Sequence, residues 1–163
     1  MTIEERLAAL EARCRAAEDH LEILNLLNSY GPLVDSGWAE EAPKLWQDGG
    51  SYNYGLPGGG NGRLEKDVLH TMYESEGHMG LVNAGCAHLT ATPKITVDGD
   101  RASAVGYSFV VLREGDRWYL WRAAVNEWSL VRTADGWRIK DRFNRTLDGS
   151  KESHEVMRRV AAI

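Results

Sequence analysis

The sequence predicts an α+β domain in which a curved, mostly antiparallel sheet wraps around helices into a cone with an internal pocket. Helical patterns dominate the first part of the chain, whereas residues 86–147 form long strand-like runs. Acid–glycine turns separate these runs, as expected for antiparallel hairpins. Helices followed by such strands are typical of domains in which helices pack on one face of the sheet.

Length and charge restrict the possible functions. The 163 residues suffice for a single domain over residues 1–163, built around one core. A net charge of −5 with scattered Lys and Arg argues against nucleic-acid binding. No apolar run approaches the ~18 residues of a membrane span, so we expect no membrane insertion. Two distant cysteines and an acidic start without a signal-peptide pattern predict a reduced, cytoplasmic protein.

The first predicted element is a long helix with a narrow apolar stripe. Its members alternate spacings of four and three: Ile3, Leu7, Leu10, Cys14, Ala17, Leu21 and Leu24. We expect the later half to cover the core and residues 1–17 to form an extension that reaches another subunit, the alternative being a plain surface helix. The stretch "NSYGPLVDSG" should close the helix at its Gly–Pro pair, with Tyr30 and Asp35 pointing into a pocket.

The segments that follow each have a local signal. We expect a helix in "SGWAEEAPKLW" capped by Ser36 and kinked at Pro43, a strand in "SYNYGL", a flexible loop in "PGGGNG", a helix in "RLEKDVLHTMYES" and a C-terminal helix in "KESHEVMRRVAAI". The glycine loop lacks the Gly-Lys-Ser/Thr ending of a phosphate-binding loop. The predicted strands are "CAHLTATPKITV", "RASAVGYSFVVL", "RWYLWRAAVNEWSLV" and "GWRIKDRFNRTL". Six Trp and six Tyr are available to line the cavity, although for any individual Trp a place in the core is the more common role.

Three stretches carry a family resemblance: "EILNLLNSYGPLVDSGWAEEAPKLWQDGGSY", "HLTATPKITVDGDRASAVGY" and "VRTADGWRIKDRFNR". They resemble SnoaL-like proteins of the nuclear-transport-factor-two-like superfamily over nearly the whole chain. The arrangement is most similar to the cofactor-free lyase branch, which includes scytalone dehydratase, hexachlorocyclohexane dehydrochlorinase and bile-acid dehydratase. The resemblance implies the cone, no cofactor, a hydrophobic aromatic or steroid-like substrate and a homo-oligomer, most readily a homotrimer. One fold hosts many functions, so activity must be argued from the site.

The resemblance also implies site residues. Asp35 and His88 fall where those lyases hold an Asp/His dyad, and Tyr30 matches the hydroxyl-bearing residue five positions before the acid. Arg145 takes the place of a catalytic arginine, although a one-residue bulge would substitute Arg142. The bile-acid enzyme has a further acid on a middle strand, whereas "ASAVGYSFVVL" contains none.

The chemistry of these residues fits a proton-abstracting site. A neutral imidazole at His88 is a suitable base, and a carboxylate at Asp35 would fix its tautomer and stabilise its cation. Arg145 would hold an oxyanion or leaving group, and Tyr30 would donate a hydrogen bond. Each residue also has a structural explanation, such as a helix cap for Asp35 or a core aromatic for Tyr30.

Other readings of the sequence remain open. Cys86 and His88 share one side of a strand and could act as thiol and base, and His70 and His78 could reach the pocket rim. No zinc motif such as H-E-x-x-H and no organic cofactor motif occurs, so we expect neither a metal nor a cofactor. The function classes are a lyase, an isomerase, cyclase or hydrolase of polyketide or steroid type, and a non-catalytic module such as a ligand-binding protein or the small subunit of a ring-hydroxylating oxygenase.

Overall fold

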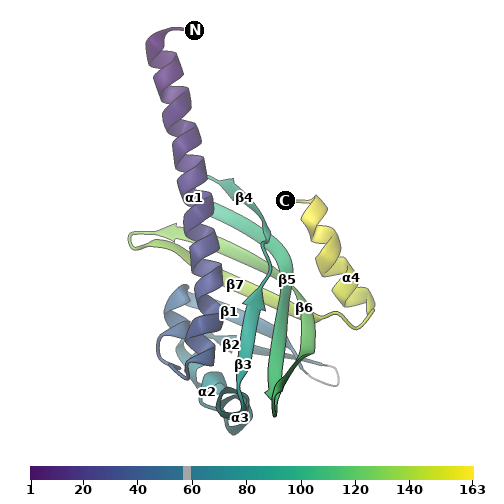
Figure 1. The fold of residues 1–163 in the computed structure, drawn as a ribbon. Coiled ribbons are helices and arrows are strands. Elements are labelled where there is room, and N and C mark those ends of the chain that lie inside the picture. Colours follow the sequence, from purple (N-terminus) through teal and green to yellow (C-terminus); the bar gives the residue numbers. More distant parts are fainter. Residues whose placement is uncertain (57–59) are drawn as a thin grey trace.

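The computed structural model describes residues 1–56 and 60–163, and it consists of a curved seven-stranded sheet with helices on both faces (Figure 1). The α-helices are α1 (Ile3–Asp35), α2 (Leu69–Tyr73), α3 (Glu76–Ala84) and α4 (Lys151–Arg158). Short 3₁₀ helices cover Ala42–Leu45, Lys66–Val68 and Arg159–Ala161. The strands are β1 (Trp46–Gly55), β2 (Asn61–Glu65), β3 (Cys86–Thr90), β4 (Lys94–Asp98), β5 (Arg101–Glu114), β6 (Arg117–Thr133) and β7 (Gly136–Thr146).

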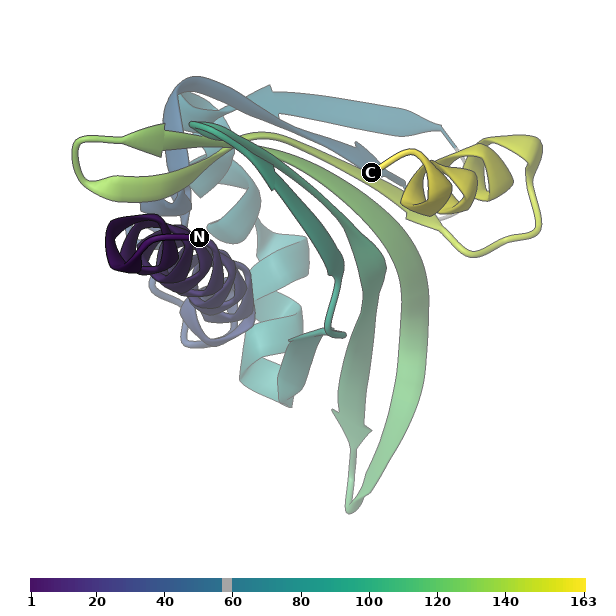
Figure 2. The ribbon, with the colours of Figure 1, turned by 90° about the horizontal axis from the view of Figure 1, so that it is seen from above.

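The sheet has the order β2-β1-β7-β6-β5-β3, and β4 also pairs with β5. Every pairing is antiparallel except that of β1 with β7, which is parallel. The long strands β5, β6 and β7 bend across the molecule, and α1, α2 and α3 lie on the concave side of that bend (Figure 2). The predicted fold class, an α+β architecture with a curved and mostly antiparallel sheet, is confirmed.

Helix α1 is one continuous helix of 33 residues, and the predicted break at Gly31–Pro32 is wrong. Proline removes a single backbone N–H, and a last turn can continue past it because Pro32 still accepts a hydrogen bond from the N–H of Ser36 at 3.1 Å. Ser36 therefore ends α1, with its hydroxyl donating to the carbonyl of Leu33, and does not begin a second helix. Asp35 is therefore the last residue of α1 and lies next to the sheet.

The apolar stripe of α1 is only partly used within one chain. Residues 1–18 are exposed and the first half of the helix projects beyond the sheet (Figure 1). The stripe that enters the core consists of Ile23, Leu27, Tyr30 and Val34, whereas Leu21 is 60% exposed. The prediction that the later half of the apolar stripe, which includes Leu21 and Leu24, covers the core is therefore wrong, because the buried residues lie on a neighbouring face of the helix.

Residues 36–75 hold less helix than the sequence predicts. The expected helix after Ser36 is reduced to turns and the 3₁₀ helix Ala42–Leu45, and the expected helix over residues 63–75 is divided into β2, a 3₁₀ turn and α2. The predicted strand at residues 51–56 belongs to the longer β1. Of the predicted glycine loop, residues 57–59 lie outside the described residues. The four later strand runs and the C-terminal helix are confirmed, the first run being divided into β3 and β4.

Two apolar clusters hold the layers together. The larger one lies between the concave face and the helices and includes Trp46, Trp128 and Trp137, each at most 2% exposed. The smaller one joins Val156 of α4 to Val105 and Val125 on the outer face of the sheet. Among the described residues, no helix is both long and apolar enough to cross a bilayer.

Candidate active site

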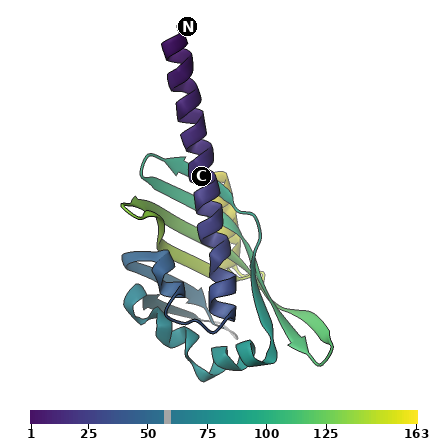
Figure 3. The same cartoon turned by 60° about the vertical axis from the view of Figure 1, so that its left-hand side comes forward.

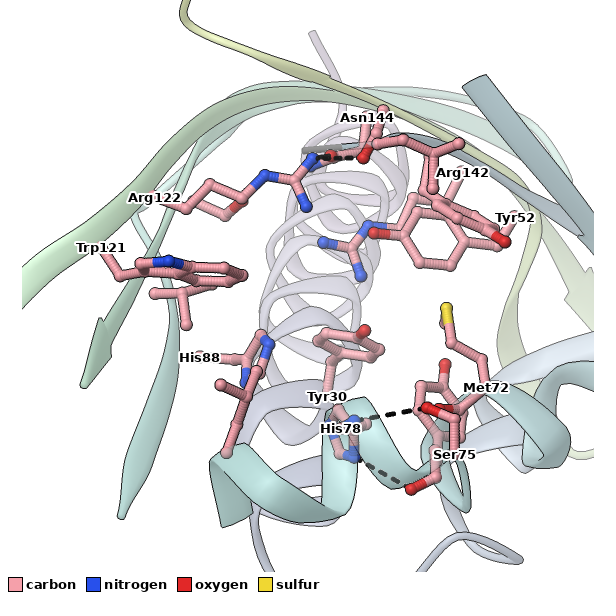
Figure 4. A pocket seen from close by; sticks show the side chains of 17 residues that line it. Tyr30, Tyr52, Met72, Ser75, His78, His88, Trp121, Arg122, Arg142 and Asn144 are labelled. Carbon is pink, nitrogen blue, oxygen red and sulfur yellow. Dashed lines mark hydrogen bonds between the residues drawn. The ribbon is translucent and has the colours of Figure 1, made fainter. Parts of the chain in front are cut away.

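The concave side of the sheet encloses a cavity of about 270 Å³ beside the end of α1. Its walls come from α1, α2, α3 and strands β1, β3, β5, β6 and β7, so residues far apart in the sequence meet there (Figure 4). The lining is mainly apolar and aromatic, and four of the six tyrosines contribute to it: Tyr30, Tyr52, Tyr54 and Tyr73. Of the tryptophans only Trp121 lines this cavity, and Trp46, Trp128 and Trp137 belong to the core.

Asp35 and His88 form the pair that the sequence analysis predicts. The Oδ1 atom of Asp35 lies 2.6 Å from Nδ1 of His88, and Oδ2 accepts a hydrogen bond of 2.6 Å from the backbone N–H of His88. Because the carboxylate takes the proton on Nδ1, the neutral ring carries its lone pair on Nε2. No protein atom in residues 1–56 and 60–163 bonds to Nε2, and the ring lines the cavity.

The environment keeps Asp35 ionised. Burial alone would raise the pKa of its carboxyl group, but hydrogen bonds from the ring and backbone of His88 outweigh burial and lower it. The side chains of Asp35 and His88 are 17% and 19% exposed, so the pair is sheltered from bulk water. A charged carboxylate behind a neutral imidazole is the arrangement that stabilises an imidazolium when the ring takes up a proton.

Tyr30 also lies at the cavity, as predicted. Its ring meets the ring of His88 edge-on at a centroid distance of 6.2 Å. Burial raises the pKa of the Tyr30 hydroxyl to about 12, so the phenol stays a hydrogen-bond donor at neutral pH. Tyr73, which the sequence analysis did not single out, contributes a second hydroxyl that is buried without a partner among the described residues.

Arg142 lines the cavity and Arg145 does not, so the placement of Arg145 in the pocket is wrong. The side chain of Arg145 lies outside the cavity, where it pairs with Glu152 of α4 at 2.7 Å and stacks on Phe143. The guanidinium of Arg142 lies over the rings of Tyr30 and Tyr52, at 4.3 and 4.5 Å. Arg142 is only 5% exposed.

A β-bulge in β7 explains why Arg142 lines the cavity and Arg145 does not. Ser129 of β6 pairs with Asp141 whereas Leu130 pairs with Ile139, so Lys140 has no partner in the ladder. Before the bulge the odd-numbered residues Trp137 and Ile139 face the core, and after it the even-numbered Arg142 takes over. The bulge anticipated in the sequence analysis as the alternative is therefore present, and it selects Arg142.

A second bulge supplies two further cavity residues that the sequence analysis missed. Val110 of β5 pairs with Arg122 but Val111 pairs with Leu120, which leaves Trp121 as the extra residue of β6. Consecutive residues of a regular strand face opposite sides, yet Trp121 and Arg122 both line the cavity. Only the run of large side chains "RWYLWR" hints at this irregularity in the sequence.

His78 lies in the cavity wall, whereas His70 does not line it. The Nδ1 atom of His78 is 3.0 Å from the carbonyl oxygen of Tyr73, and its ring centroid is 5.8 Å from that of His88. Burial lowers the pKa of His78, so this ring is a neutral group beside the dyad. Its Nε2 atom is buried and has no partner in the described part of the chain.

Cys86 points to Asp35 rather than to His88. Its thiol donates a hydrogen bond of 3.2 Å to Oδ1 of Asp35, and burial together with this carboxylate raises the pKa of the thiol to about 12. A thiol with so high a pKa is a poor nucleophile. Asp35, Cys86 and His88 offer ligand atoms within 4.8 Å of one another, but a metal there would have to deprotonate the thiol and displace the Asp35–His88 hydrogen bond.

Comparisons with known proteins place this architecture in a family. A sequence model described as the SnoaL-like domain matches residues 15–143. A solved NTF2-like protein with a cystatin-like fold from Novosphingobium aromaticivorans is 34% identical, with a TM-score of 0.83 over 93% of this chain and 96% of that one. No curated protein matched this sequence.

More distant structures share the fold. The β subunit of a putative aromatic-ring-hydroxylating dioxygenase from Novosphingobium aromaticivorans is 22% identical, with a TM-score of 0.64 over 80% of this chain and 90% of that one. A protein of unknown function from Mycobacterium tuberculosis is 18% identical, with a TM-score of 0.66 over 99% of this chain and 92% of that one. These similarities concern the fold alone.

Proposed function

The chain belongs to the SnoaL-like domain family, and from this membership and the geometry of its cavity we propose that it is a cofactor-independent lyase. The proposed reaction eliminates water, halide or a small carbonyl fragment from a hydrophobic cyclic or aromatic substrate. The observation that supports it most directly is the His88–Asp35 pair, held at 2.6 Å with Nε2 free at the cavity wall. Arg142 and His88 both line this cavity (Figure 4).

Each side chain has one role in the proposed elimination. Nε2 of His88 takes a proton from a carbon next to an electron-withdrawing group, and Asp35 stabilises the imidazolium that forms. The electron pair of the broken C–H bond forms the new double bond as the bond to the leaving group breaks. Arg142 and the hydroxyl of Tyr30 stabilise the negative charge that develops on the substrate or on the leaving group. The imidazolium then returns its proton to the departing group.

The proposal is tested by incubating the protein with hydroxylated and halogenated cyclic ketones and acids and following the products by mass spectrometry. Native mass spectrometry of ligand retained from the expression host would narrow this panel. Once a substrate turns over, His88→Ala should lower kcat by about 10²- to 10⁴-fold, the usual contribution of a positioned base. Tyr30→Phe should have a smaller effect, corresponding to one lost hydrogen bond.

His154→Ala is the matched control, because His154 is exposed on α4 and remote from the cavity lining. It should leave kcat unchanged. Full activity in a folded His88→Ala protein would remove His88 from the reaction and return Asp35 to a structural role at the end of α1.

Two other functions make different predictions. An isomerase or cyclase would use the same base but give a product of unchanged mass. A small subunit of a ring-hydroxylating oxygenase is suggested by the dioxygenase β subunit that shares the fold. Under that alternative an oxygenase partner should co-purify, and His88→Ala should not affect turnover by the assembled complex.

We also propose that the protein is a homo-oligomer, in the first instance a trimer. The exposed apolar stripe of residues 3–17 supports this assembly, because the described residues of one chain do not cover it. Exposed aromatic and aliphatic side chains at the tip of the β5–β6 hairpin offer a second surface: Trp118, Tyr119 and Leu120.

A further inference from the structure

Two arginines give one wall of the cavity a positive charge. Arg122 of β6 and Arg142 of β7 both line it, and the guanidinium of Arg142 lies against the rings of Tyr30 and Tyr52 (Figure 4). Within residues 1–56 and 60–163, neither guanidinium lies within 4.0 Å of a carboxylate. Because arginine cannot be deprotonated in a protein, both groups remain charged in a largely apolar cavity.

A chain of buried amides holds the two guanidiniums in place. Nη2 of Arg122 donates to Oδ1 of Asn144 at 2.7 Å, and Nδ2 of Asn144 donates to Oδ1 of Asn126 at 2.8 Å. The same oxygen of Asn126 accepts a hydrogen bond of 3.0 Å from Nε of Arg142. Asn126 and Asn144 are 0% and 2% exposed, so this network is fixed by the sheet interior. Neutral amides orient the arginines without cancelling their charge.

The remaining donors of these arginines are available to a ligand. Arg142 donates through Nε to Asn126, and the hydroxyl of Tyr30 is a second polar neighbour of its guanidinium within the described chain. The rings of Tyr30 and Tyr52 lie 4.3 and 4.5 Å from the central carbon of its guanidinium and are neutral, so they do not cancel its charge. Arg122 bonds through Nη2 to Asn144 and to the carbonyl of Gly55 at 2.9 Å, and its Nε is buried without a partner in the described chain.

A buried charge without a counter-ion is costly, and a planar carboxylate is the anion that fits a guanidinium edge best. Much of the rest of the lining is apolar, with Met72, Leu81, Val110 and Trp121 among its members, beside two serines and two histidines. We propose that the cavity binds small compounds in which a carboxylate is attached to an apolar ring, and that Arg122 and Arg142 together hold that carboxylate. A cavity of about 270 Å³ suits a ligand of one or two rings.

The link of this site to catalysis rests on the proposed function, but the binding itself does not. If His88 removes a proton from the carbon next to the carboxylate, the developing charge spreads onto the same oxygens that the two arginines hold. The arginines would then serve both recognition and reaction. A protein that only binds ligands would show the same preference for carboxylates.

Isothermal titration with 1-naphthoate and its neutral amide, 1-naphthamide, separates charge from shape. The wild-type protein should bind the carboxylate at least about 10-fold more tightly than the amide. Arg122→Gln should weaken naphthoate binding by about 10- to 100-fold and leave naphthamide within about 2-fold. Arg117→Gln removes the same charge from the exposed end of the same strand and should change neither affinity.

Arg142→Lys provides a second variant, because loss of the whole side chain from a buried site endangers folding. It keeps the charge but loses the planar pair of donors, so naphthoate binding should weaken while thermal unfolding remains cooperative. Equal affinity for acid and amide, no binding of naphthoate, or binding unaffected by Arg122→Gln would each overturn the carboxylate site.

His88→Ala distinguishes failure of this inference from failure of the proposed function. The variant should keep the preference for naphthoate over naphthamide, because neither Arg122 nor Arg142 donates a hydrogen bond to His88. Arg122-dependent binding combined with unimpaired turnover by His88→Ala would refute the proposed base and keep the carboxylate site. Loss of turnover in His88→Ala, combined with equal binding of acid and amide by the wild-type protein, would support the proposed base and refute the carboxylate site.

Discussion

Asp35 acts on His88 at two points. One carboxylate oxygen fixes the ring through Nδ1 and the other holds the backbone N–H of the same residue. The side chain of an asparagine has only one acceptor oxygen. Its NH₂ group would face either Nδ1–H or the backbone N–H of His88, and both of these are donors, so Asp35→Asn leaves one of the two hydrogen bonds unmade. We expect this variant to lose about 1–3 kcal/mol of stability, measured by urea unfolding, in addition to most of its activity. An unchanged stability would show that the carboxylate does not hold β3.

The same carboxylate should make stability depend on pH. The pKa of Asp35 is lowered in the folded protein, so the folded state binds the proton less tightly than the unfolded chain does. Its contribution is therefore complete above the unfolded pKa of about 4 and is lost as the pH falls through the folded pKa. The stability difference between wild type and Asp35→Asn should be constant near neutrality and shrink in acid. A difference that persists unchanged in acid would contradict this linkage.

Cys86 and Cys14 should differ sharply in reactivity. Burial beside Asp35 raises the pKa of the Cys86 thiol to about 12, whereas Cys14 is exposed on α1. In a protein whose assembly is disrupted by Leu10→Glu, so that the stripe of residues 3–17 is uncovered, iodoacetamide at neutral pH should therefore modify Cys14 and spare Cys86, as judged by peptide mass spectrometry. Cys14 serves as the control within the same molecule. Rapid modification of Cys86 in the folded protein would revive the thiol-nucleophile interpretation.

At the scale of elements, the contact between α1 and β3 sets the geometry of the dyad. A Cβ atom added at Gly31 would lie 2.0 Å from the carbonyl oxygen of His88, which is too close for any side chain. Gly31→Ala should therefore separate the helix from the strand, lower the unfolding temperature and reduce the activity that depends on Asp35 and His88. Both quantities can be followed on the same preparation.

Gly80→Ala is the matched control for this prediction. Gly80 also lies inside a helix, α3, but a Cβ atom there would meet nothing within 4 Å. Alanine is the better helix former by about 1 kcal/mol, so this variant should be neutral or slightly stabilised. Equal behaviour of the two variants would mean that the close approach of α1 to His88 does not determine the site.

The irregularities of these elements mark what the sequence could and could not predict. Turn residues and long strand-like runs predicted the β-hairpins, because those signals are local. The bulges at Lys140 and Trp121 depend on how neighbouring strands pair, so the sequence left Arg145, which the family resemblance implied, and Arg142 as alternatives. Arg122 was missed for the same reason.

The end of α1 also depends on contacts that local sequence signals do not show. Gly31 and Pro32 suggested a break, but tertiary contacts carry α1 on to Asp35 and bury Tyr30 and Val34 in its last turns. The pairing of Asp35 with His88 was predicted through the family resemblance. Spacing alone could not bring together two residues that are 53 positions apart.

At the scale of the whole molecule, the projecting half of α1 is the feature that one chain leaves unexplained. Ile3, Leu7 and Leu10 are 79%, 56% and 52% exposed, and the helix extends well beyond the sheet (Figure 3). An isolated helix of this length is marginally stable in water, and a heptad stripe is stabilised by packing against another helix. Helices from further copies of the chain would cover it.

This argument predicts the outcome of sedimentation experiments. The intact protein should sediment at a multiple, expected to be three, of the 18.2 kDa mass of one chain. Leu10→Glu places a charge in the stripe and should shift the protein toward smaller species, whereas Ala9→Glu adds the same charge next to the stripe and should not. Deletion of residues 1–14 should weaken assembly as Leu10→Glu does, while the unfolding of the remaining domain stays cooperative because residues 1–18 make no part of its core. A monomeric intact protein at micromolar concentration would refute the assembly, and an oligomer unaffected by the deletion would move the interface to the β5–β6 hairpin.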